Sequence, residues 1–206
     1  RESLMAIVKP FRGVRPPREI ASDLACLPYD VMNTAEARKM AEGKECSLLH
    51  ITRAEIDLPA DTDVHSGEVY DKSRSNFARW IKNGWLVQDD EPHFYIYAQT
   101  MAGRTQYGIA GCASVEDYLD GKIRKHELTR PDKEQDRMVH IRTNNANLEP
   151  VFLTYPAVKE IDAIVKKIVR KEKPEYDFRA GDGFGHHFWV VRDREVNIRA
   201  QNSPHK

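Results

Sequence analysis

The segment richest in side chains that can do chemistry runs from Lys122 to Arg137. Its sixteen residues carry seven basic side chains, counting one histidine, and four acids. Cationic side chains pair with phosphate oxygens, and a carboxylate can take a proton from a substrate hydroxyl. These residue types therefore predict anion binding and proton transfer. The alternative is a solvated loop and helix whose charges pair with one another three or four residues apart.

Within this segment, Glu127 is the candidate general base and His126 its neighbour in the proposed chemistry. The two can converge if residues 123–128 form a loop, but they point to opposite faces if those residues are extended. Pro131 is suited to the first position of a helix, whose free backbone N–H groups would bind the same anion. The cationic candidates for that anion are Lys125, Arg130 and Arg137.

Other polar positions carry weaker signals. Arg12 and Asp30 lie in proline-containing connections, where a simple ion pair explains them as well as a site does. The asparagine cluster at 144–147 is at an expected helix end, and asparagine caps helices readily in the left-handed conformation. His186 and His187 are adjacent on a predicted strand and face opposite ways. No HExxH, P-loop or GxGxxG motif is present, so no metal site is predicted.

Composition limits the classes of function. Lysine plus arginine equals aspartate plus glutamate, so the formal net charge is zero and nucleic acid is not an expected partner. No apolar run approaches the ~20 residues of a membrane span, and no secretory signal opens the sequence. Three cysteines without CxxC spacing argue against a disulfide framework and favour the cytoplasm. Residues 1–4, which precede Met5, are expected to be a cloning remnant.

The pattern of apolar and turn residues predicts an α+β fold, with a mixed, mainly antiparallel sheet and flanking helices, over residues 5–206. A helix from Ser66 to Asn83 and a β-hairpin over 94–113 are the clearest elements. Pro156 starts another amphipathic helix. Further helices are expected at 17–24, 34–40 and after Pro131 with Met138 and Ile141 buried, and further strands at 7–8, 47–52, 151–155, 176–179 and 187–192.

Several of these segments together resemble a known family, the bacterial and archaeal "domain of unknown function 1015" proteins. The resemblance runs in order along nearly the whole chain. It rests on PFRGVR from Pro10, LPYDV from Leu27, WIKNGWLVQD from Trp80, YIY from Tyr95, KHELT from Lys125 with Lys133 and Asp136-Arg137, and Ala146-Asn147 before Pro150-Val151-Phe152.

The resemblance implies a fold related to ParB and sulfiredoxin, and kinship with nucleotide-dependent kinases of free serine. The implied reaction is phosphoryl transfer from ADP or ATP with Mg²⁺. His126, Glu127, Thr129 and Arg137 match the family's HExT…DR signature, whereas Arg12 and Asp30 match its N-terminal motifs. We assign Glu127, His126 and Asp30 as catalytic and expect the phosphate- or substrate-binding residues to be Arg12, Lys125, Thr129, Arg137 and Asn147.

One departure from the family concerns the phosphate-binding motif. Family members are longer and carry a Gly-His-His-Arg-Tyr motif in their second half. Here Gly185-His186-His187-Phe188-Trp189 is similar but has Phe in place of Arg. Residues 5–206 are therefore expected to be either a single α+β domain or the N-terminal portion of a longer family member.

Two functions are expected from these observations. The first is a small-molecule kinase of the serine type, and the second is a non-catalytic nucleotide-binding or regulatory module like ParB.

Overall fold

The computed structural model describes residues 6–125 and 128–193, and these residues form an α+β fold with antiparallel sheets, as expected. They divide into two compact units. The sheet unit takes the described residues up to Val14, from Gln88 to Lys125, and from Thr154 onward. The helical unit takes Arg15–Val87 and the described residues that follow Glu127 as far as Leu153. Within the described ranges, no helix is both long and apolar enough to cross a membrane.

The sheet unit is built on four antiparallel strands in the order β5-β4-β8-β7. The predicted hairpin is confirmed as β4 (Tyr95–Met101) and β5 (Arg104–Ala110). It turns through Ala102 and Gly103, which both have positive φ, as a two-residue hairpin turn requires. The strands β7 (Tyr176–Arg179) and β8 (Gly185–Val190) confirm the two expected near the end of the chain.

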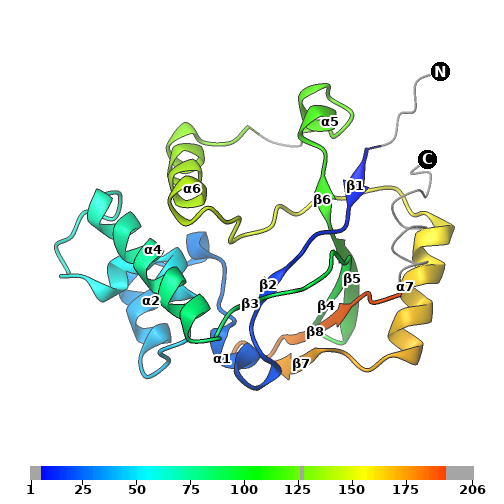
Figure 1. Cartoon of the computed structure of the whole chain (residues 1–206), viewed down its shortest axis with the longest axis horizontal. Coiled ribbons are helices and arrows are strands. Elements are labelled where there is room, and N and C mark those ends of the chain that lie inside the picture. Colours follow the sequence, from blue (N-terminus) through cyan, green and yellow to red (C-terminus); the bar gives the residue numbers. More distant parts are fainter. Residues whose placement is uncertain (1–5, 126–127, 194–206) are drawn as a thin grey trace. The chain divides into compact units, whose positions relative to one another are not determined.

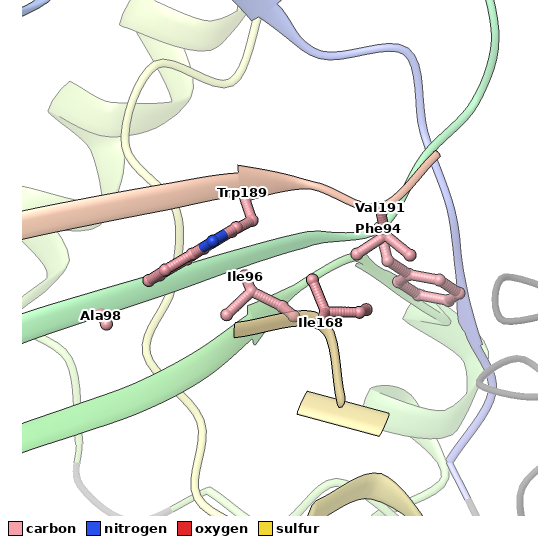
Figure 2. Close-up of a cluster of buried hydrophobic side chains, with 6 residues drawn as sticks. All are labelled: Phe94, Ile96, Ala98, Ile168, Trp189 and Val191. Carbon is pink, nitrogen blue, oxygen red and sulfur yellow. The ribbon is translucent and has the colours of Figure 1, made fainter. Parts of the chain in front are cut away.

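The core of this unit lies between the sheet and helix α7 (Lys159–Lys171). Ile168 of the helix packs against Ile96, Trp189 and the neighbouring apolar side chains of the strands, as Figure 2 shows. Burial of each large apolar side chain contributes roughly 1.5–3 kcal/mol to folding. Because the apolar face of α7 packs against the sheet, the amphipathic stripe predicted after Pro156 is confirmed.

A small extension completes the sheet unit. Strand β1 (Val8–Lys9) pairs with β6 (Cys112–Ala113), and the short helix α5 (Val115–Leu119) follows. Buried Asp117 anchors this extension, because its carboxylate accepts the backbone N–H of Ile7 at 2.6 Å and pairs with Lys122 Nζ at 2.8 Å. The strands β2 (Val14–Arg15) and β3 (Val87–Gln88) form a separate two-stranded ribbon where the chain passes between the units.

In the helical unit the other helices pack around the long helix α4 (Gly67–Lys82), as Figure 1 shows. Trp80 of α4 is fully buried. Helix α2 (Thr34–Ala41) confirms the helix expected at 34–40 and begins at a capping box formed by Asn33 and Glu36. The other elements of the unit are η1 (Arg18–Ile20), α1 (Ala21–Leu24), η2 (Tyr29–Val31), α3 (Leu49–Thr52), η3 (Ala54–Asp57) and α6 (Pro131–Asn144).

Two predicted strands are wrong. The first, over 47–52, is the helical turn α3, whose carbonyl groups find partners on α4: Ser73 Oγ donates to the Ile51 carbonyl and Asn76 to that of His50. The second, over 151–155, has no regular structure, and Phe152 in it is 75% exposed. An apolar run forms a strand only where a neighbouring strand accepts its backbone hydrogen bonds.

Candidate functional site

Helix α6 buries polar residues instead of apolar ones. Asp136, His140 and Asn144 are buried, and their spacing of four residues places them on one face of the helix. The predicted buried side chains, Met138 and Ile141, are instead 36% and 43% exposed, so that prediction is wrong. Because buried polar groups need hydrogen-bond partners, this face must be matched by polar groups on its neighbour.

Helix α4 supplies those partners (Figure 1). Tyr70 Oη donates to Asp136 Oδ1 at 2.7 Å, and the ring of Tyr70 meets that of His140 edge-on at 5.1 Å. Asn144 Nδ2 donates to Ser73 Oγ at 3.1 Å and to the His140 carbonyl at 3.0 Å. The two helices therefore meet through two groups of hydrogen bonds linked by the contact between the Tyr70 and His140 rings, which fixes their register more narrowly than apolar contacts would.

Arg137 extends this network toward solvent. Its Nη2 donates to Asp136 Oδ2 at 2.7 Å and its Nη1 to Glu149 Oε2 at 2.9 Å. The guanidinium lies 3.6 Å from the centre of the Tyr29 ring, a cation–π contact, and is 23% exposed. Glu149 also accepts a hydrogen bond from the Tyr29 backbone N–H. Arg137 is thus held on three sides, and its position is fixed.

The two carboxylates bound to Arg137 titrate in opposite directions. Burial by itself raises the pKa of Asp136, but hydrogen bonds from Arg137 and Tyr70 outweigh it and the pKa lies below its ordinary value. For Glu149, burial outweighs the opposing effect of Arg137, and the pKa is raised. Glu149 is therefore the carboxylate of this network that is better suited to take up a proton.

The neighbouring aromatic groups are held neutral. Burial, and then the charge of Arg137, lower the pKa of His140 to about 4. Burial and the hydrogen bond to Asp136 raise the pKa of Tyr70 to about 12. Burial raises the pKa of Tyr29 against the opposing charge of Arg137. At neutral pH the charges of this network are therefore those of its carboxylates and Arg137.

Two of the residues chosen from the sequence come together here. Asp30 is exposed on η2, and its charge adds to the raised pKa of Glu149. Arg137 binds the same Glu149 directly. Thr129 and Asn147 also belong to the helical unit, but both are exposed, and Thr129 Oγ1 donates to Glu134 at 3.1 Å.

The remaining candidates lie elsewhere. Arg12 and Lys125 belong to the sheet unit. Arg12 Nε donates to the Asp89 carbonyl at 2.8 Å, and Lys125 Nζ lies 4.9 Å from the centre of the Tyr118 ring. His126 and Glu127 lie outside the described residues. The catalytic and binding roles assigned from the sequence all stay predictions.

Sequence reasoning missed Tyr29, Tyr70, His140 and Glu149 as members of the site. One signal was available for His140, because Asp136, His140 and Asn144 recur every four residues in a segment whose apolar residues form no continuous stripe. No comparable pattern marks Glu149, which follows α6 in an irregular segment. Its partnership with Arg137 depends on the path of the chain after the helix.

This arrangement suits proton transfer from a hydroxyl better than phosphate binding. Asp136 and Glu149 already balance the charge of Arg137, so an incoming anion would have to displace one of them. Glu149 has a side chain that is 27% exposed and a raised pKa, as a general base near neutral pH needs. Among the residues described, no cluster of three or more histidine, cysteine, aspartate or glutamate side chains is arranged to hold a metal ion.

Comparisons with known proteins identify the family. Residues 8–203 match the family model described as "Protein of unknown function (DUF1015)". No curated protein and no solved structure matches the chain. The expected relation to ParB and sulfiredoxin therefore stays a prediction. Because the match covers almost the whole sequence, the chain belongs to the DUF1015 family.

Proposed function

We propose that this protein is a nucleotide-dependent kinase of a small hydroxy compound such as L-serine, and that the network around Arg137 binds the acceptor. The observation that supports this most is the state of Glu149, a partly exposed carboxylate with a raised pKa, fixed between Arg137 and the Tyr29 backbone. General bases need a pKa close to the working pH and a fixed position.

Each group has a role in the proposed reaction. The acceptor hydroxyl lies against Glu149, which takes its proton as the oxygen attacks the terminal phosphorus of the donor. The new O–P bond replaces the bond to the leaving nucleotide, which departs with that electron pair. Arg137 positions Glu149 through the hydrogen bond between them. Phosphoryl transfer needs little more from a protein than such positioning and charge stabilisation.

The phosphates of ADP or ATP need positive charge that Arg137 does not offer, because Asp136 and Glu149 balance it. Lys133, whose Nζ lies 5.8 Å from the centre of the Tyr29 ring, is a further cation of the helical unit near this network. Magnesium binds through one or two carboxylates together with phosphate oxygens, and Asp30 is a suitable oxygen ligand for it. When bound, the ion would neutralise charge on the transferred phosphoryl group.

The test is to incubate the protein with L-serine, Mg²⁺ and either ADP or ATP, and to follow O-phosphoserine by ³¹P NMR. We expect product, and we expect Glu149→Gln to lower its rate by about 10²–10⁴-fold, the usual contribution of a general base. Glu68→Gln is the matched control, because Glu68 is exposed on α4 of the same unit. Failure to phosphorylate serine or any related hydroxy-amino acid would refute the kinase proposal.

A second candidate is a non-catalytic nucleotide-binding or regulatory module of the ParB type. It is favoured by the complete pairing of Arg137, which a purely structural role also explains. Calorimetry separates the two candidates. Binding of nucleotide without turnover, unchanged in Glu149→Gln, supports the module and contradicts the kinase.

A further inference from the structure

A pocket of about 590 Å³ lies in the sheet unit, at the end of the four-stranded sheet. One wall is apolar and aromatic, with Tyr107, Trp189 and Val169. The rings of Tyr107 and Trp189 are inclined to each other at 41° with centres 6.4 Å apart. In Figure 2, Trp189 lies beside the strand that carries Ala98, where the apolar core ends. Such a wall suits a flat apolar group.

The pocket is also lined by a row of four polar side chains, one from each strand of the sheet. Asp177 Oδ1 lies 2.9 Å from His187 Nδ1, and His187 Nε2 lies 3.2 Å from Thr100 Oγ1. Thr100 Oγ1 lies 2.8 Å from Thr105 Oγ1. The four groups therefore form one unbroken chain of hydrogen bonds across β7, β8, β4 and β5.

A glycine makes room for this chain. Gly185 pairs with Thr100 across the strands, and a methyl group there would lie 3.2 Å from His187 Nε2 and 3.3 Å from Thr100 Cβ. Any side chain at this position would press on the contact between His187 and Thr100. Gly181, in the turn between β7 and β8, has open space around it.

The direction of the hydrogen bonds depends on one proton. A carboxylate only accepts, so His187 Nδ1–H donates to Asp177 in either state. In neutral His187, Nε2 accepts from Thr100, which in turn accepts from Thr105. In protonated His187, Nε2–H donates to Thr100, Thr100 donates to Thr105, and the Thr105 O–H is released to donate into the pocket. When His187 is neutral, the Thr105 hydroxyl can only accept a hydrogen bond from a ligand in the pocket. When His187 is protonated, the same hydroxyl can donate one.

We propose that this pocket binds a small carboxylate that carries an aromatic group, and that binding takes up one proton on His187. The aromatic group lies against Trp189 and Tyr107. One carboxylate oxygen accepts from Thr105, and the other pairs with Arg179, which also lines the pocket and donates from Nη1 to the Gly183 carbonyl at 2.9 Å.

The charges around the pocket support an anion only in the protonated state. Asp177 and Arg179 both come from β7, and their charges cancel. Tyr107 of β5 adds no charge. Helix α7 and the loop after it contribute only Val169 and Pro174 to the lining, which are uncharged. His186 is adjacent to His187 on the same strand. With His187 protonated, the groups lining the pocket carry a net positive charge. This site is independent of the kinase proposal, and either can fail without the other.

The experiment uses the Trp189 indole N–H, which donates to the Glu172 carbonyl at 3.1 Å, as an NMR reporter. Phenylacetate is titrated in parallel with the neutral benzyl alcohol and with phenyl phosphate. We expect phenylacetate to shift this resonance and to bind at least tenfold more tightly than either other probe. Calorimetry at neutral pH in buffers of different ionisation enthalpy should show uptake of about one proton. The affinity for phenylacetate should fall as the pH is raised, because binding takes up a proton.

Variants distinguish a loss of phenylacetate binding at the site from a loss of stability of the sheet. Gly185→Ala and the exposed-site change Thr105→Val should each weaken phenylacetate at least tenfold, whereas the matched control Gly181→Ala should not. His187→Gln should abolish the proton uptake. If Gly185→Ala does not fold, Thr105→Val decides. An unshifted Trp189 resonance with all three probes overturns the proposal, as does benzyl alcohol or phenyl phosphate binding as tightly as phenylacetate.

Discussion

Replacing Asp136 by asparagine tests whether the polar face of α6 stabilises the helical unit. The Asp136 carboxylate accepts from Tyr70 Oη at 2.7 Å and from Arg137 Nη2 and Nε at 2.7 and 3.3 Å. A hydrogen bond to a charged group contributes roughly 1 kcal/mol more than a neutral one, which gives about 3 kcal/mol for three bonds. Arg137 keeps Glu149 and is partly exposed, so we expect a loss of about 2–3 kcal/mol.

The assay must report on the helical unit alone. Trp80 and Trp85 belong to that unit and Trp189 to the sheet unit. In a Trp189→Phe background, tryptophan fluorescence therefore follows unfolding of the helical unit. Urea denaturation of this background with and without Asp136→Asn gives the difference in the free energy of unfolding.

The control is Asp132→Asn on the same helix, where Asp132 and its partner Arg130 are both more than half exposed. Exposed pairs contribute little, so this change should stay within about 0.5 kcal/mol of the parent. Tyr70→Phe, combined with Asp136→Asn in a double-mutant cycle, should show a coupling of about 1 kcal/mol. A loss no larger than that of Asp132→Asn, or no coupling, would refute the reasoning.

The same comparison has a defined pH dependence. The pKa of Asp136 is lowered in the folded protein, so its charge contributes stability that is fully present above the unfolded pKa of about 3.9. That contribution is lost as the pH falls through the lower folded pKa. The stability curves of the parent and of Asp136→Asn should therefore run parallel above about pH 5 and converge below about pH 4.

Three further outcomes are expected. Gly111→Ala, just after β5, should destabilise the sheet unit by about 1–3 kcal/mol, because its methyl group would lie 2.7 Å from the Val8 side chain and 2.8 Å from that of Phe94. Gly108→Ala within β5 meets only ordinary contacts, and thermal unfolding compares the two. Burial raises the pKa of Cys26 to about 12, so iodoacetamide should alkylate exposed Cys112 well before Cys26, as mass spectrometry would show. Glu127→Gln tests the base assigned from the sequence against Glu149: loss of serine phosphorylation in Glu127→Gln, with turnover kept in Glu149→Gln, would identify Glu127 as the base and contradict the role proposed for Glu149.

Local patterns in the sequence were enough to predict much of the fold. The capping box at Asn33, the hairpin turn at Ala102-Gly103 and the apolar stripe of α7 each depend on residues close together in the chain. Such signals act before tertiary structure forms, so sequence reasoning can use them. The left-handed helix end at Asn145, with φ of 49°, was predicted in the same way.

The errors have a common physical cause, because in each case distant residues decided the structure. The 47–52 segment has strand-like composition, yet Ser73 and Asn76 of α4 satisfy its backbone in a helical form. Met138 and Ile141 are the apolar residues of α6, yet Tyr70 makes the opposite, polar face the buried one. Tertiary partners outweigh local preference in such places.

The candidate site was predicted only in part for the same reason. Arg137 and Asp30 were chosen from the sequence, but the carboxylate between them, Glu149, was not. Its raised pKa depends on burial and on neighbours from other parts of the chain. Sequence reasoning finds charged residues, whereas it is the fold that selects the one able to exchange a proton.

The interleaving of the two units has a consequence for biosynthesis. The chain changes unit four times, after Val14, Val87, His126 and Leu153. The helical unit therefore has all of its residues once Leu153 has been made, whereas the hairpin of β4 and β5 must wait for β8, which is synthesised last. During translation the helical unit can fold first, while the β4 edge of the sheet unit is still unpaired. The interval before β8 emerges is thus the period in which a nascent chain would most need a chaperone.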